Sequence, residues 1–255
     1  MPLFLTSLDG LLWLALALAV LSFLQRRMHY EIQTVFLILT RHPGITIVIF
    51  ALLFLPGVFL HELSHFLMAK ILQVRTGRFS LIPDPMPDGR LQMGYVETER
   101  TDFVRDSLVG AAPILFGTLF IAWIALDRLQ MTVMWDVFRN GQANLFFMAL
   151  AALPNQPDFW LWFYLAFAVS STMMPSDSDR HAWTPPIVVV SIFFVLLILA
   201  GAGPWMLENL APPLNLFLRG TALVLVVSVT IHLILIVPFL FFHRVLTRLT
   251  GLDVG

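Results

Sequence analysis

Long, nearly uninterrupted apolar runs constrain this chain more than any other feature of its sequence. Three of them are the segments Leu11–Leu24, Ile45–Leu60 and Ile187–Ala200. Runs of this kind suit helices that cross a bilayer, where about 20 apolar residues span the hydrocarbon. Only 12% of the residues are charged, against about 25% in an average soluble domain, so polar surface is too scarce for a water-soluble particle. The sequence therefore predicts an all-α, polytopic helical membrane protein that is embedded in the lipid bilayer.

We expect about six transmembrane helices in a single membrane domain that comprises residues 1–255. Their expected ranges are 5–24, 44–72, 107–127, 158–174, 185–204 and 220–242. The extramembrane loop 73–106 has a different composition, since it holds 11 of the 31 charged residues. Within this loop, the runs Gly77–Ile82 and Arg90–Glu97 flank the turn-forming segment Pro83–Gly89. This pattern predicts a small β-hairpin-like loop on the membrane surface.

Charge and cysteine content exclude several classes of function. The net charge is −1 and the chain has a single lysine, so it lacks the basic surface that binds nucleic acid. The absence of cysteine excludes disulfides, thiolate metal sites and cysteine nucleophiles. We therefore expect no nucleic-acid partner, and any metal ligands must be histidines or carboxylates.

The motif His61-Glu62-Leu63-Ser64-His65 lies directly after one of the apolar runs. Two histidines four residues apart lie on one face of a helix and can share a Zn²⁺ ion, while Glu62 can take a proton from a metal-bound water. With 7 His and 5 Glu in 255 residues, the pattern is expected by chance about 0.004 times. Ionisable residues in a membrane helix are costly and mark functional sites. The motif therefore predicts a catalytic metal centre rather than a polar cluster that only joins helices.

With two further segments, this motif makes the chain similar to the site-2 protease family of intramembrane zinc metalloproteases. The resemblance covers a core from about residue 44 to residue 182. It rests on the HExxH helix, the small-residue segment Leu108–Gly117 and the acidic segment Ser170–Arg180. The resemblance implies Zn²⁺ as the cofactor, His61 and His65 as ligands, Glu62 as the catalytic base and an aspartate as the third ligand.

The family carries its third ligand in an Asn-x-x-Pro…Leu-Asp-Gly pattern, and this chain departs from that pattern. Ser171 or Thr172 stands near the place of the Asn, and no Gly follows either candidate aspartate. Asp177 follows a proline by two residues, as in the family, whereas Asp179 belongs to a Pro-Ser-x-x-Asp-Arg run of the kind found in divergent relatives. We take Asp179 as the third ligand and Asp177 as the alternative. Ser176 and Asp179 also have the spacing of a capping box, which predicts a helix start instead.

The expected path of the helices places the site on the side of the membrane that carries the 73–106 loop. If successive helices alternate in direction, both chain termini and the segment 175–184 lie on that side too. This side then collects 9 Lys or Arg residues against 6 on the other. By the positive-inside rule, we expect the active site nearer the cytoplasmic face.

These features together predict an intramembrane zinc endopeptidase that cleaves membrane-anchored protein substrates, with Glu62 as general base. A non-proteolytic zinc-binding scaffold or transporter would keep the same fold, but zinc binding alone does not require Glu62. A protease of the CAAX-processing or heat-shock type shares HExxH but uses a downstream glutamate as a ligand. Here only Glu97, Glu99 and Glu208 follow the motif, all in expected loops.

Overall fold

The computed structural model describes residues 9–85 and 91–252, and most of these residues are helical. Among the described residues, five helical segments are long and apolar enough to cross a membrane. They are α2 (Asp9–Thr40), α3 (Pro43–Ile71), α4 (Phe103–Trp123, continued by a π-helical segment to Arg128), α8 with α9 (Thr184–Asn209) and α10 (Ala211–Thr250). The prediction of an all-α polytopic membrane protein is confirmed.

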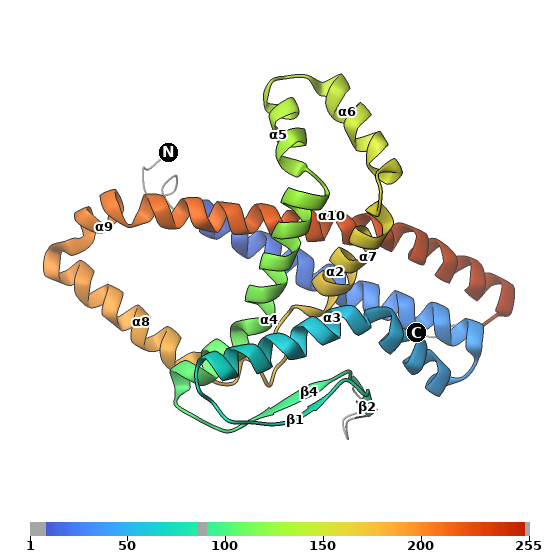
Figure 1. Ribbon diagram of the computed structural model, residues 1–255, viewed down its shortest axis with the longest axis horizontal. Coiled ribbons are helices and arrows are strands. Elements are labelled where there is room, and N and C mark those ends of the chain that lie inside the picture. Colours follow the sequence, from blue (N-terminus) through green and yellow to red (C-terminus); the bar gives the residue numbers. More distant parts are fainter. Residues whose placement is uncertain (1–8, 86–90, 253–255) are drawn as a thin grey trace.

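Two of the expected spans differ from simple straight crossings. α7 (Phe159–Thr172) occupies the span expected at 158–174, but its 14 residues make it only about 21 Å long. The span expected at 185–204 is bent. Gly201 has a φ of 89°, and the bend there separates α8 (Thr184–Leu197) from α9 (Gly203–Asn209). The short helices α5 (Met131–Arg139) and α6 (Ala143–Ala152) connect α4 to α7 and project away from the rest of the protein (Figure 1).

α2 and α10 lie side by side and run in the same direction (Figure 1). Near their first residues, Arg219 Nε donates a 2.8 Å hydrogen bond to Asp9 Oδ1. Farther along, His243 Nδ1 lies 2.5 Å from Glu31 Oε2, and Arg27 pairs with the same carboxylate. Glu31 is fully buried, and a buried charge needs such partners. These ionic contacts explain why α2 continues past its expected end at residue 24.

The parallel packing of α2 and α10 contradicts the alternating path expected from the sequence. In the expected path the first and the last helix run in opposite directions, whereas the contacts Arg219–Asp9 and His243–Glu31 align the two helices in the same direction. The expected position of the site nearer the cytoplasmic face stays a prediction.

α3 and α7 contact each other through their backbones. A Cβ atom at Gly57 would lie only 2.1 Å from the Ala168 carbonyl oxygen and 2.5 Å from Thr172 Oγ1. One turn earlier on α3, Tyr164 Oη of α7 donates a 3.0 Å hydrogen bond to the Leu53 carbonyl. A glycine at position 57 therefore lets α7 approach the helix that carries the HExxH motif, which is the usual role of small residues between membrane helices.

The expected β-hairpin is present and lies along α3 (Figure 1). Its strands β1 (Thr76–Ser80) and β4 (Tyr95–Thr98) are antiparallel, and the short strands β2 (Asp84–Pro85) and β3 (Leu91–Gln92) extend it. The tip of the expected turn, residues 86–90, lies outside the described residues. The Phe79 ring meets the Phe66 ring of α3 edge to face, with 6.4 Å between centroids. This contact fixes the hairpin beside the HExxH helix.

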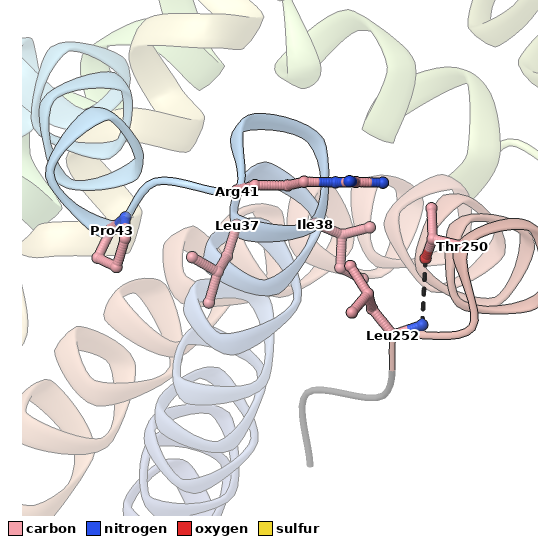
Figure 2. A pocket seen from close by; sticks show the side chains of 6 residues that line it. All are labelled: Leu37, Ile38, Arg41, Pro43, Thr250 and Leu252. Atoms are coloured by element: carbon pink, nitrogen blue, oxygen red, sulfur yellow. Dashed lines mark hydrogen bonds between the residues drawn. The ribbon is translucent and has the colours of Figure 1, made fainter.

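An open cavity of about 420 Å³ lies where α2 ends, α3 begins and α10 ends. Figure 2 shows the side chains that line it, which are Leu37, Ile38, Arg41, Pro43, Thr250 and Leu252. None of these residues is a carboxylate or a histidine, and Pro43 is 18 residues before His61 on α3. This cavity is therefore distinct from the metal centre expected from the sequence.

Gly57→Ala is expected to lower the free energy of unfolding by about 1–3 kcal/mol, because the new methyl group overlaps the Ala168 carbonyl and overpacking has this cost. Gly220→Ala is the matched control, since a Cβ there meets no atom within 4 Å. Titration of the purified protein with denaturing detergent, followed by circular dichroism, measures both changes. Wild-type stability of Gly57→Ala would contradict the close contact between α3 and α7.

Candidate metal centre

The two histidines of the HExxH motif lie one turn apart on α3 and point to the same place. Their Nε2 atoms are 3.2 Å from each other, and the ring of His65 is mostly buried. The structure thus places both imidazoles on one helix face, as their spacing predicts.

Each histidine ring is oriented by a backbone carbonyl of a neighbouring helix. His61 Nδ1 lies 2.7 Å from the Thr172 carbonyl oxygen at the end of α7, and His65 Nδ1 lies 2.9 Å from the Val109 carbonyl oxygen of α4. A carbonyl oxygen only accepts hydrogen bonds, so Nδ1 carries the proton in both rings. In the neutral form of each ring, Nε2 then has a free lone pair and the two Nε2 atoms face each other, which is the tautomer that binds a metal.

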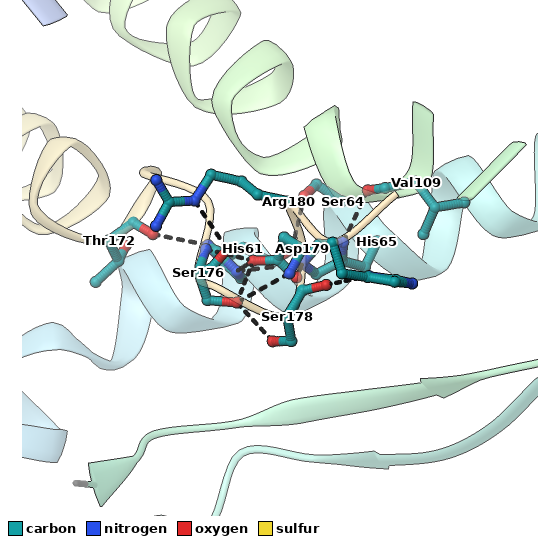
Figure 3. Close-up of polar contacts among 10 residues, drawn as sticks. His61, Ser64, His65, Val109, Thr172, Ser176, Ser178, Asp179 and Arg180 are labelled. Carbon is teal, nitrogen blue, oxygen red and sulfur yellow. Dashed lines mark hydrogen bonds and ion pairs between the residues drawn. The ribbon is translucent and has the colours of Figure 1, made fainter. Parts of the chain in front are cut away.

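Asp179 completes this arrangement from the turn between α7 and α8 (Figure 3). Its Oδ1 atom lies 3.3 Å from His65 Nε2, and its Oδ2 atom lies 3.7 Å from His61 Nε2. The ligand atoms of the three residues all lie within 4.8 Å of one another. When both rings are neutral, these three acceptors converge without a donor between them and repel one another unless a cation lies among them. The group His61, His65 and Asp179 is thus able to hold a metal ion.

The capping box expected at Ser176 and Asp179 is also present, so the two roles of Asp179 coexist. Ser176 donates from its backbone N and from Oγ to Asp179 Oδ2, both at 2.7 Å. The Asp179 backbone N donates in return to Ser176 Oγ at 3.3 Å. These bonds close a hydrogen-bonded turn that precedes α8 rather than the first turn of a helix. They hold Oδ2 in place and leave Oδ1 directed at His65.

Electrostatics keep the Asp179 carboxyl group ionised. Burial raises its pKa, but hydrogen bonding and positive charge from the His61 and His65 rings in their protonated form, together with the hydrogen bonds from Ser176, outweigh that effect and hold the pKa well below its usual range. An ionised carboxylate is the form that binds a divalent metal.

The small-residue segment of α4 packs against the turn that carries Asp179. A Cβ at Gly110 would lie 2.0 Å from the Asp179 carbonyl oxygen, and a Cβ at Gly117 would lie 2.6 Å from Met173 Cβ. The resemblance to site-2 proteases included this segment, Leu108–Gly117, but it did not predict which residues Gly110 and Gly117 contact. In the structure they let α4 approach both ends of the connection from α7 to Asp179.

Asp177, the alternative third ligand, lies apart from the two histidines. Its Oδ1 atom pairs with Arg180 Nη2 at 2.6 Å, and 70% of its side chain is exposed. Among the described residues, the group of possible metal ligands contains Asp179 and not Asp177. Metal binding by Asp179 stays a prediction, but the geometry of the two aspartates favours it.

Glu62 lies next to His61 on α3 and is buried under the β-hairpin. Only 7% of its surface is exposed. A Cβ at Gly94, which directly precedes β4, would lie 3.0 Å from Glu62 Cγ and equally close to Val58 Cγ1. The backbone of the hairpin therefore covers the carboxylate that the sequence assigns as the catalytic base.

Several groups that build the site carry no signal in the sequence. The carbonyls of Val109 and Thr172 orient the rings, yet a backbone carbonyl is present at every residue. Gln25 and His232 contact the end of α7, from which Thr172 reaches His61. His232 is fully buried, with both ring nitrogens in hydrogen bonds. Comparisons of the chain with family models, curated proteins and solved structures found no match.

Asp179→Ala is expected to strip the protein of its metal, because only two imidazoles remain as ligands. Metal affinity should fall by more than the roughly 10–100-fold that is lost when a residue that only hydrogen-bonds to a metal ligand is replaced. Asp177→Ala is the matched control, since it removes the same charge two residues away, from a side chain directed at Arg180. Metal analysis after dialysis measures both. Full metal content in Asp179→Ala with loss in Asp177→Ala would transfer the role to Asp177.

Gly110→Ala is expected to lower metal content as well, although the residue touches no ligand atom. The new methyl group collides with the Asp179 carbonyl and has to displace the turn by more than the roughly 0.5 Å that a functional site tolerates. Gly203→Ala serves as the control, since its Cβ meets only a side-chain atom at 4.0 Å. Unchanged metal affinity in Gly110→Ala would show that the turn adapts without cost.

Proposed function

We propose that this protein is a zinc-dependent intramembrane endopeptidase that hydrolyses peptide bonds of membrane-anchored proteins. One observation carries the proposal: His61, His65 and Asp179 converge on one point beside a buried glutamate on an apolar helix. The resemblance of the HExxH motif to site-2 proteases supports the same reading.

The donor set fits zinc. Zn²⁺ binds His nitrogen and carboxylate oxygen at about 2.0–2.2 Å in a tetrahedron, which puts ligand atoms about 3.3–3.6 Å apart. Here the two Nε2 atoms are 3.2 Å apart and Asp179 Oδ1 lies 3.3 Å from His65 Nε2, and one ligand atom from each of the three residues lies within 4.8 Å of the others. Three protein ligands also leave one tetrahedral position open, as in catalytic rather than structural zinc sites.

A Zn²⁺ ion at this site would polarise the scissile carbonyl and lower the pKa of a water molecule toward about 7. Glu62 then acts as general base: its carboxylate accepts a proton as the water oxygen bonds to the carbonyl carbon. Glu62 returns that proton to the amide nitrogen as the C–N bond breaks, which yields an amine and a carboxylic acid. Burial of Glu62 under the hairpin excludes bulk water and strengthens its interactions with the reacting groups.

The position of the site supports a membrane-anchored protein as the substrate. His61 and His65 lie on α3, an apolar helix long enough to cross the membrane, so a peptide bond has to reach them from within or beside the bilayer. A soluble peptide would lose its hydration on that path. A membrane-anchored protein with a locally unwound helix meets this requirement.

Glu62→Gln is the test of the proposed reaction. The amide keeps the shape of the side chain but cannot accept a proton, so cleavage should fall by about 10²–10⁴-fold or more while zinc stays bound. Glu99→Gln, in the exposed loop, is the matched control and should retain both zinc and cleavage. Zinc content and cleavage of a membrane-embedded test substrate in proteoliposomes are the two measurements. Wild-type turnover in Glu62→Gln, or absence of turnover in a zinc-loaded wild-type protein, would favour a zinc-binding scaffold instead.

A further inference from the structure

The C-terminal end of α7 lies inside the protein, where its free backbone groups need partners. The last four carbonyls of an α-helix have none within the helix, and Ser170 and Ser171 are both buried. Gln25 of α2 is buried as well, and its Nε2 donates to the Ser170 carbonyl oxygen. A glutamine in a membrane helix is costly, and this contact gives Gln25 a specific partner.

The next residue of α7 is held from α10. His232 is fully buried, and its Nδ1 lies 2.8 Å from the Ser228 carbonyl oxygen on its own helix. That carbonyl only accepts, so Nδ1 carries the proton and Nε2 has a free lone pair. Ser171 Oγ lies 3.1 Å from Nε2 and therefore donates to it. The contact fixes how the end of α7 is turned about its axis.

The third consecutive residue, Thr172, makes the contact that matters for the metal centre. Its carbonyl oxygen accepts from His61 Nδ1 and thereby sets the direction of His61 Nε2. Seven residues later the chain reaches Asp179. Successive residues of a helix point about 100° apart, so these three consecutive residues of α7 face three different helices: α2, α10 and α3. Their contacts together fix both the rotation and the position of the C-terminal end of α7.

We propose that Gln25 and His232 are positioning residues for the metal centre. They hold the end of α7 so that the Thr172 carbonyl orients His61 and the following turn delivers Asp179. This inference rests on the proposed metal binding by His61, His65 and Asp179. It assigns a role to two polar residues from helices that carry no metal ligand, α2 and α10.

The test uses Co²⁺ in place of zinc, because the visible absorption of Co²⁺ reports the geometry of its ligands. Gln25→Met keeps the size of the side chain but cannot donate, and His232→Leu cannot accept. Both variants should shift the Co²⁺ absorption bands and weaken Co²⁺ binding by about 10–100-fold, as loss of outer contacts does at metal sites. His232→Gln retains an acceptor and should recover part of the wild-type spectrum. Gln33→Met, at an exposed position of the same helix, is the matched control.

The outcomes separate this inference from the proposed function. A wild-type protein that binds no Co²⁺ would refute the metal site itself. If the wild-type protein binds Co²⁺ and the spectra and affinities of Gln25→Met and His232→Leu equal those of the wild type, the positioning role is wrong. It is also wrong if Gln33→Met changes the spectrum as much as Gln25→Met does. Circular dichroism of each variant checks that it is folded, and Gln25→Met keeps the test decisive if His232→Leu does not fold.

Discussion

The hydrogen bonds from the Nδ1 atoms of His61 and His65 to the carbonyls of Thr172 and Val109 join three helices at one point. In an apolar interior such donors and acceptors have few other partners, so each bond is costly to lose. The bonds fix the tautomer and direction of both rings, and Asp179 meets the remaining lone pairs from a turn closed by Ser176. Helix packing and the chemistry of the candidate metal centre thus depend on the same contacts.

Local features of the sequence predicted much of this structure. The apolar runs located most of the membrane helices, and the turn residues between Gly77–Ile82 and Arg90–Glu97 predicted the hairpin. The spacing of His61 and His65 predicted that both rings share a face. Each of these follows from the chemistry of a short segment, in which the period of the backbone decides which side chains meet.

Contacts between distant segments were not predictable in the same way. Partners for Glu31 on α2 itself and on α10 let α2 extend to Thr40, and the sequence gives no sign that His243 of α10 would be one of them. The parallel direction of α2 and α10 contradicts the alternating path that the sequence led us to expect, because it depends on contacts such as Arg219–Asp9 between residues far apart in the chain. The sequence also left Asp177 and Asp179 open, because only the turn that Ser176 closes decides which carboxylate faces the histidines.

X-ray absorption at the zinc edge of the protein purified from zinc-containing medium tests the central claim most directly. The account predicts one zinc per chain with nitrogen and oxygen neighbours at about 2.0–2.1 Å and outer scattering from two imidazole rings. A protein without stoichiometric zinc, or a zinc spectrum that lacks imidazole scattering, would contradict it.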